Sequence, residues 1–281
     1  MIKNNYDYII YGASLPGSLL AERLAEKRYS ILLLNEYGFP GGSLTESLNC
    51  CQNVLGVSSK IKNVIAIINE NKPGTFRKTD DAVIFNPESV KFAVQKIIDE
   101  SEVDLLYHVK IVELNTEPNS TQVKLSGKEG LLQINCERLI DATDGHLLSN
   151  IVGANSLPEN IEYNLIAANI KKAVCRSLPR INRIQSLDDG RVFLNFKFPP
   201  QEILFIENLI QTEIAKIDEM IKMKGGRIQL LPAQTNIINK IDIPDSNDLY
   251  VDVDTIIGKS FPVNEILIKA SMIENLDLSK I

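Results

Sequence analysis

The chain has 281 residues, a formal net charge of −6 and no tryptophan. This length predicts one large or two small domains. The excess of acidic residues argues against a strongly basic nucleic-acid binder, and the apolar runs are shorter than the ~20 residues of a membrane span. The first residues contain no hydrophobic signal segment, so we expect a cytoplasmic protein. Four cysteines in a chain of this length do not indicate a disulfide framework.

The first half of the chain alternates strand and helix signals. A β-rich run at 7–11 ends at Gly12, and apolar residues then recur at helical spacing from Leu15 to Lys27. Ser30–Leu34 is a continuous apolar run, which is typical of a parallel strand buried on both faces. These three elements predict a βαβ unit.

More elements follow this unit. One helix is predicted at Ser58–Asn69, and another begins after Asn86, because Asn86 is a favourable N-cap and Pro87 suits the first helical position. Strand-like runs come next, at 104–112, 122–126, 131–135 and 138–142.

The second half has weaker patterns. Residues 163–198 read as strands with poor alternation, and Pro199–Lys224 is a long helix with isoleucines on one face. That isoleucine face either belongs to the core or docks on a partner subunit. Short strands (227–231 and 249–253) and a final helix (263–275) complete the chain.

The segment Gly12-Ala13-Ser14-Leu15-Pro16-Gly17 lies where a strand passes into a helix, which is the place of a dinucleotide-binding fingerprint. Gly12 allows a tight turn, Gly17 allows the helix to pack closely on the sheet, and Ser14 stands where the pattern has glycine. Free backbone N–H groups at the helix start would attract a pyrophosphate. The alternative is a structural turn that binds no ligand.

The end of the second strand is the place for an acidic residue that holds ribose hydroxyls, about 20 residues after the fingerprint. Asn35 occupies this place, and Glu36 follows it. Either Asn35 makes a neutral contact to the ribose, or Glu36 makes the contact after a shift of one residue. A solvated loop position for Glu36 is equally consistent with the sequence.

Several segments in the same order resemble the FAD-dependent oxidoreductases of the glutathione-reductase-like Rossmann superfamily. The resemblance covers about residues 5–155, and it is carried by Tyr6–Gly12, Ile31–Glu36, Gly41-Gly42-Ser43-Leu44-Thr45, Asn86–Ser89, Arg138–Gly145 and Ile151–Ala154. The closest branch has a GG-x-x-T segment after its second strand.

This resemblance implies FAD as the cofactor and an α/β fold, with a parallel sheet and helices on both faces. Residues 1–160 and 225–281 would form the FAD-binding domain, and 161–224 a small cap over the substrate. The implied cofactor-binding residues are Gly12, Ala13, Ser14, Pro16, Gly17, Asn35, Glu36, Gly41, Gly42, Thr45, Thr143 and Gly145.

Two further segments differ from the family pattern. Thr143-Asp144-Gly145 has the order Thr-Asp-Gly where the family has Thr-Gly-Asp. In the closing motif, Asp248–Asp254, Asp252 stands in the place of a glycine. A negative charge there would be unfavourable beside a pyrophosphate.

The chain has two histidines, His108 and His146. His108 lies inside a predicted strand and is expected to be structural. His146 follows the loop beside the predicted flavin crevice, and it is our candidate catalytic residue because an imidazole can accept a proton near neutral pH. No Cys/His spacing predicts a metal site. The adjacent pair Cys50-Cys51 either packs in the core or brings a thiol near the flavin.

The sequence therefore predicts an FAD-dependent oxidoreductase that transfers a hydride from a small molecule to the flavin. The alternative is a member of the same fold without catalysis, which acts as a structural or regulatory subunit. A partner subunit or a homo-oligomer is compatible with either function. No second dinucleotide fingerprint predicts NAD(P)H binding.

Overall fold

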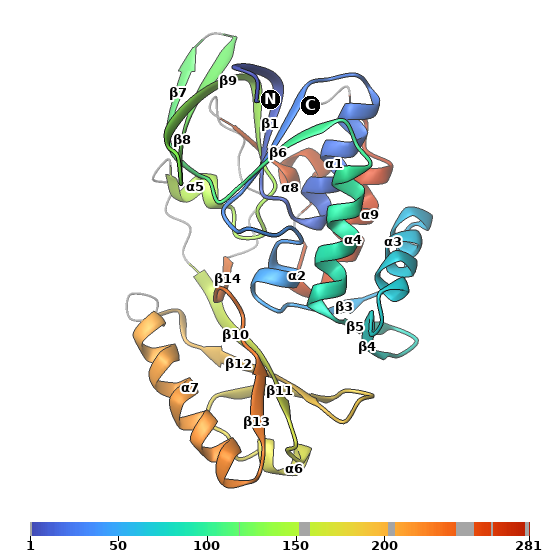
Figure 1. Ribbon diagram of the computed structural model, residues 1–281, viewed down its shortest axis with the longest axis vertical. Helices are drawn as coiled ribbons and strands as arrows, with labels where there is room; N and C mark the ends of the chain where they lie inside the picture. Colours follow the sequence, from blue (N-terminus) through green and yellow to red (C-terminus); the bar gives the residue numbers. More distant parts are fainter. Residues whose placement is uncertain are drawn as a thin grey trace.

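The computed structural model of the protein describes residues 2–117, 119–151, 158–201, 206–239, 250–259, 261–278 and 281 (Figure 1). A seven-stranded sheet lies in the upper half of the view, and a five-stranded sheet with the long helix α7 lies below it. Within these residues no helix has both the length and the apolar character needed to cross a membrane.

The seven-stranded sheet has the order β6-β2-β1-β9-β8-β7, and β15 pairs with β9. Strands β6, β2, β1, β9 and β15 run parallel, whereas β7, β8 and the first part of β9 form an antiparallel meander. The bounds are β1 Asn5–Tyr11, β2 Ile31–Asn35, β6 Val103–Tyr107, β7 Lys110–Glu117, β8 Ser120–Gly127, β9 Gly130–Asp141 and β15 Val251–Asp252. The predicted βαβ unit is confirmed, and the two predicted strands at 131–135 and 138–142 form the single strand β9.

Helices α1 (Leu15–Glu26), α4 (Pro87–Asp99) and α9 (Ile266–Glu274) cover one face of this sheet. The opposite face was expected to carry helices as well. It carries one short helix, α5 (Leu147–Ile151), and side chains of the curled β7–β8 hairpin pack on it as well. Because the meander continues directly into the parallel strand β9, it can fold back over the sheet and bury this face.

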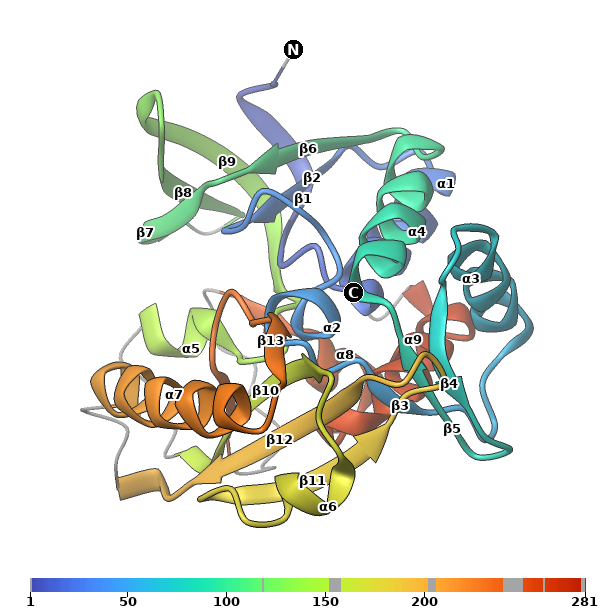
Figure 2. The same ribbon diagram turned by 60° about the horizontal axis from the view of Figure 1, so that its bottom comes forward.

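The five-stranded sheet has the order β11-β12-β10-β13, and β14 also pairs with β10 (Figure 2). Isoleucines of α7 (Ile206–Met223) pack on one face of it, so the isoleucine face predicted at 199–224 belongs to a core. Strands β13 and β14 come after residue 225. The predicted boundary at 224/225 would therefore separate them from the other strands of the five-stranded sheet. The bounds are β10 Pro158–Ala168, α6 Lys172–Cys175, β11 Ile181–Ser186, β12 Val192–Phe198, β13 Arg227–Leu230 and β14 Asn236–Asn239.

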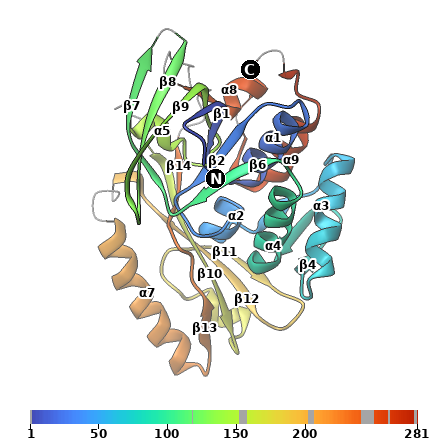
Figure 3. The ribbon, with the colours of Figure 1, turned by 45° about the horizontal axis from the view of Figure 1, so that its top comes forward.

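A three-stranded sheet, β3-β5-β4, lies beside α3 and α4, at the side of the molecule opposite α7 (Figure 3). The remaining elements are α2 Ser43–Glu46, β3 Cys51–Asn53, α3 Ser59–Glu70, β4 Thr75–Lys78, β5 Ala82–Phe85, α8 Val253–Ile257 and a 3-10 helix Val263–Glu265. Cys50 and Cys51 are buried, and burial raises the pKa of Cys50 to about 12, so packing is the better interpretation of this pair. Parts of three predicted segments lie outside the described residues, namely 152–154, 202–205 and 249.

Candidate functional site

A cavity lies where β1, β2 and β9 end, at the carboxyl edge of the parallel strands. This edge is where open α/β sheets bind their ligands. The cavity has a volume of about 170 Å³, which is smaller than the roughly 300–1,000 Å³ of complete small-molecule sites. It is therefore too small to enclose a whole dinucleotide. Its lining residues are Tyr11, Gly12, Ser14, Asn35, Glu36, Tyr37, Gly42, Ser43, Glu46, Ser47, Thr143, Asp144, Gly145, Leu147 and Gln234–Ile237.

Seven of the twelve predicted cofactor-binding residues line this cavity, although they come from four separate segments. These residues are Gly12, Ser14, Asn35, Glu36, Gly42, Thr143 and Gly145. The other five predicted residues do not form its wall: Ala13 and Gly41 lie in the adjoining loops, Pro16 and Gly17 in the first turn of α1, and Thr45 in α2.

The glycines of the first loop are required by close backbone packing. Gly12 has a φ of +109°, and a Cβ atom there would come within 2.8 Å of the backbone of Ala142. A Cβ atom on Gly17 would lie 2.3 Å from the carbonyl oxygen of Gly12. The predicted tight turn and close helix packing therefore match the structure.

Ser14 has a different role from the glycine that it replaces. It is the N-cap of α1, and its Oγ accepts a hydrogen bond from the N–H of Gly17 at 3.1 Å. Pro16 has no backbone N–H group. The helix start thus offers fewer free donors than the sequence predicted, and the pyrophosphate contact at this loop stays a prediction.

Asn35 connects three loops through its side chain. Its Oδ1 accepts from the N–H of Ala13 at 3.1 Å, and its Nδ2 donates to the carbonyl of Phe39 at 2.8 Å. Glu36 accepts a hydrogen bond from the Tyr11 hydroxyl and lies 3.7 Å from Nζ of Lys110. Because the amide of Asn35 is engaged inside the protein, the geometry favours Glu36 for a ribose contact.

The loop Gly41-Gly42 packs directly on the first loop. A Cβ atom on Gly42 would come within 2.7 Å of the Cβ of Ser14, so only glycine fits here. Thr45 stabilises this loop from inside, since its hydroxyl donates to backbone carbonyls within it. Ser43 donates its backbone N–H to the carboxylate of Asp144 at 2.7 Å, while its own buried Oγ has no hydrogen-bond partner among the residues that the structure describes.

Behind Thr143, the buried carboxylate of Asp141 organises the loop that leaves β9. It accepts from the backbone N–H of Thr143 at 2.9 Å, from the Thr143 hydroxyl at 2.6 Å and from the N–H of Leu148 at 2.8 Å. Burial, followed by the charge of Asp252, raises the pKa of Asp141, and these three hydrogen bonds oppose that effect. Thr143 and Gly145 consequently reach the cavity on a fixed loop.

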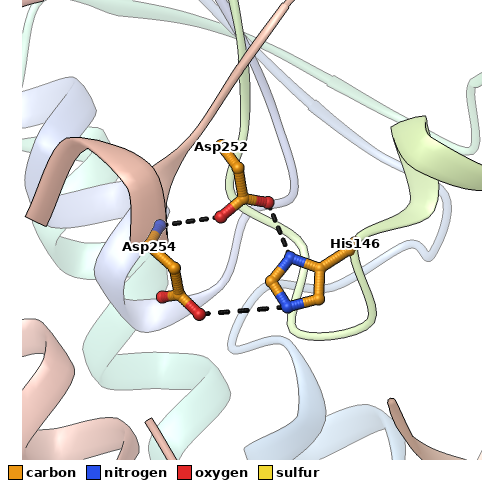
Figure 4. A group of neighbouring side chains, drawn as sticks. All are labelled: His146, Asp252 and Asp254. Atoms are coloured by element: carbon orange, nitrogen blue, oxygen red, sulfur yellow. Dashed lines mark hydrogen bonds and ion pairs between the residues drawn. The ribbon is translucent and has the colours of Figure 1, made fainter. Parts of the chain in front are cut away.

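His146 lies between two carboxylates, as Figure 4 shows. Its Nδ1 is 2.6 Å from Oδ2 of Asp252, and its Nε2 is 3.9 Å from Oδ2 of Asp254. Burial lowers the pKa of His146, but the hydrogen bond and charge of Asp252, with those of Asp141 and Asp254, outweigh burial and raise it. Both ring nitrogens face these acids, and His146 does not line the cavity.

Asp252 has a structural function that explains its presence in place of a glycine. It is the N-cap of α8, and its Oδ1 accepts from the N–H of Asp254 at 2.7 Å. The buried ammonium of Lys269 lies 2.7 Å from Oδ1 of Asp254. Ligand atoms of His146, Asp252 and Asp254 lie within 4.8 Å of one another, a spacing that could hold a metal ion. Here, however, His146 and Lys269 already balance the negative charges of Asp252 and Asp254.

The opposite wall of the cavity comes from the start of β14, in the five-stranded sheet, and from the loop that precedes it. The segment Gln234–Ile237 lines it, and the backbone N–H groups of Ala233 and Gln234 donate to the carbonyl of Glu46 at 2.7 and 3.1 Å. Sequence reasoning missed this wall, together with Ser43 and Glu46. The GG-x-x-T segment marked the region of Ser43 and Glu46, but no pattern marked Gln234–Ile237, which reaches the site only through the tertiary fold.

The family model of FAD dependent oxidoreductases matches residues 7–156. The chain belongs to this family. The match confirms the predicted α/β Rossmann-like fold class and FAD as the cofactor. The match does not specify the glutathione-reductase-like branch, and that assignment stays a prediction. No curated protein matches the chain.

Three solved structures share the fold of this member of the family at low sequence identity. A geranylgeranyl bacteriochlorophyll reductase-like protein from Thermoplasma acidophilum has a TM-score of 0.65 and 10% identity, over 96% of this chain and 78% of that one. The p-nitrophenol 4-monooxygenase PnpA from Pseudomonas putida DLL-E4 has a TM-score of 0.58 and 9% identity, over 89% of this chain and 72% of that one. The OxyS anhydrotetracycline hydroxylase from Streptomyces rimosus has a TM-score of 0.50 and 14% identity, over 70% of this chain and 46% of that one. The match thus spans less than half of the length of OxyS.

The chemistry of the cavity fits the cofactor of this family. Gly12 and Gly42 bring the backbone to its wall at positions where a Cβ atom would clash, and Glu36 also lines it. Glycine loops leave room for a pyrophosphate, and the ribose hydroxyls of FAD can donate to the carboxylate of Glu36.

Proposed function

We propose that this protein is an oxidoreductase that binds FAD between its seven-stranded and five-stranded sheets and transfers a hydride between the flavin and a small molecule. The observation that carries the proposal is the cavity at the carboxyl edge of β1, β2 and β9, since its walls join the loops after these strands to the segment Gln234–Ile237 at the start of β14. When bound, FAD supplies the hydride chemistry through its N5 atom.

The residues of the chain would hold the cofactor in two groups. Ser14 and the turn at Gly12 would face the pyrophosphate, and Glu36 would accept hydrogen bonds from the adenosine ribose. Gly42 and Thr143 would border the flavin side, where a side chain larger than glycine at position 42 would meet Ser14. The predicted roles of Asn35 and Thr45 are indirect in this arrangement, because both side chains bond within the loops.

His146 is better suited to positioning than to direct proton transfer. Its ring joins the loop after β9 to the start of α8 through Asp252 and Asp254. The negative charges around it favour the protonated imidazole. We therefore propose that His146 fixes the loop that carries Thr143 and Gly145, in place of the acid–base role expected from the sequence.

The test is to purify the protein and record its visible spectrum, then to titrate it with FAD by calorimetry. We expect stoichiometric binding and the two visible absorption bands of an oxidised flavin. Anaerobic addition of candidate reductants, such as small alcohols and amines, should bleach the band at longer wavelength. A protein that binds no FAD would contradict the proposal and favour a structural or regulatory member of the fold.

A further inference from the structure

Tyr11 is the last residue of β1, directly before the turn at Gly12. It is 1% exposed, and it borders the cavity. A buried tyrosine hydroxyl normally has a hydrogen-bond partner. Here the hydroxyl donates to Oε1 of Glu36, which follows β2, the strand beside β1. This bond joins the carboxyl ends of two neighbouring parallel strands at the point where both reach the cavity.

The hydroxyl of Tyr11 is a constant donor. Burial first, and then the hydrogen bond to Glu36, raise the pKa of Tyr11 above its ordinary value, against the opposing backbone hydrogen bond from Ile111 of β7. The hydroxyl therefore keeps its proton at neutral pH. Since Ile111 also bonds to it, its position is set by the sheet and not by the ligand.

The carboxylate of Glu36 is accessible, because 26% of its side chain is exposed. Its Oε2 lies 3.7 Å from Nζ of Lys110, whose own side chain is 63% exposed. An ion pair as open to water as this one does little to fix a side chain. A carboxylate has about four lone-pair positions, so the bond from Tyr11 leaves several of them for donors of a ligand. The buried tyrosine, rather than the exposed lysine, is thus the group that orients Glu36.

We propose that Tyr11 is a positioning residue, which holds the Glu36 carboxylate in the orientation that accepts hydrogen bonds from the adenosine ribose of FAD. This inference rests on the proposed function. Fixing a long side chain such as glutamate at the moment of binding costs conformational entropy, and a bond formed beforehand removes that cost. Loss of the Tyr11 hydroxyl should therefore weaken FAD binding about threefold to tenfold.

The first experiment is a double-mutant cycle on the Kd of FAD, measured by calorimetry at neutral pH. Tyr11→Phe should bind FAD about threefold to tenfold more weakly than the wild type, and Glu36→Ala about tenfold or more. The double variant should stay within about twofold of Glu36→Ala, because Tyr11 acts through Glu36.

Tyr6→Phe is the matched control for this cycle. Tyr6 is 3% exposed in the same strand, and its hydroxyl donates to the carboxylate of Asp104 at 2.8 Å. Neither residue lines the cavity. The control thus removes a buried tyrosine hydroxyl from a carboxylate elsewhere in the sheet, so it should lose thermal stability and keep its affinity for FAD.

The second experiment tests the ribose contact itself. FAD is displaced with ADP and with 2′,3′-dideoxy-ADP, which lacks both ribose hydroxyls. The wild type should prefer ADP about tenfold or more, and Tyr11→Phe should reduce this preference about threefold or more. Lys110→Ala should retain it, because its ion pair is exposed. A merely structural role of Tyr11 would weaken the binding of both nucleotides equally.

Three results would each refute the positioning role. They are a Tyr11→Phe variant that binds FAD like the wild type, single-variant losses that multiply in the double variant, and an unchanged preference for ADP in Tyr11→Phe. A wild type that binds FAD but shows no preference for ADP over the dideoxy nucleotide refutes the ribose contact of Glu36 as well. A wild type that binds no FAD refutes the proposed function itself.

Discussion

The buried acid Glu46 makes a quantitative prediction about stability. In the folded protein its pKa is raised from 4.5 to about 8, mainly because burial disfavours the charged form. Between these two values the folded state keeps a proton that the unfolded state releases, so stability falls as the pH rises through this window. At about 1.4 kcal/mol per pH unit, folding at pH 7 is disfavoured by roughly 3 kcal/mol relative to acidic pH.

Glu46→Gln removes this pH-dependent cost, because glutamine is neutral in both states. We expect the variant to exceed the wild type by about 2–3 kcal/mol in free energy of unfolding near pH 7, and by little near pH 4. Urea unfolding followed by circular dichroism, at several pH values between these limits, measures the difference. A difference that does not change with pH would refute the assignment of a protonated Glu46.

Three further substitutions test the contacts behind the cavity. Asn35→Ala should lower the free energy of unfolding by about 2–3 kcal/mol, because it leaves the buried N–H of Ala13 without its acceptor. Urea unfolding at pH 7 measures this loss, and a change below about 0.5 kcal/mol would contradict the prediction. Lys269→Met should cost about 3–5 kcal/mol, since Asp254 would remain buried without its cation, and an unchanged melting temperature would show that the pair is not stabilising. His146→Ala should destabilise the protein more near pH 6 than near pH 9. A histidine with a raised pKa stabilises the fold below about pH 6.5 and loses that effect as the pH rises through its folded pKa. Equal losses of stability at both pH values would refute the ion pairs.

Local patterns predicted the elements that build the nucleotide-binding sheet. The apolar run before Asn35 is fully buried as β2, and the Asn86-Pro87 pair begins α4, where the side chain of Asn86 accepts from the N–H of Glu88 at 3.2 Å. These signals act within a few residues, so they can be read from the sequence alone. Gly12 was also predicted from its local position at a strand end, although the contacts that exclude a side chain there come from Ala142 and Thr143 of the neighbouring strand's exit.

Long-range contacts explain what the sequence did not predict. Strand β14 enters the site because it pairs with β10, which lies about seventy residues earlier in the chain. The charge state of Glu46 depends on Asp144 and Glu36, which follow two different strands. His146 was predicted from its place in the chain, but the direction of its ring is set by Asp252, more than a hundred residues away. No local pattern encodes these distances.

The acidic residues around the site are compensated one by one, which reconciles them with a cofactor that carries a pyrophosphate. Asp144 accepts the backbone N–H of Ser43, and Asp252 faces the ring of His146. Burial lowers the pKa of Lys269, but the charges of Asp254, Asp144 and Asp252 raise it by more, so that its ammonium stays charged among them. With Glu46 protonated, Glu36 is the carboxylate of the cavity wall that carries its charge toward the ligand, where ribose hydroxyls can donate to it. Asp254→Asn would therefore remove the carboxylate that faces the Lys269 ammonium and leave a positive excess behind the site, rather than relieve a repulsion in front of it.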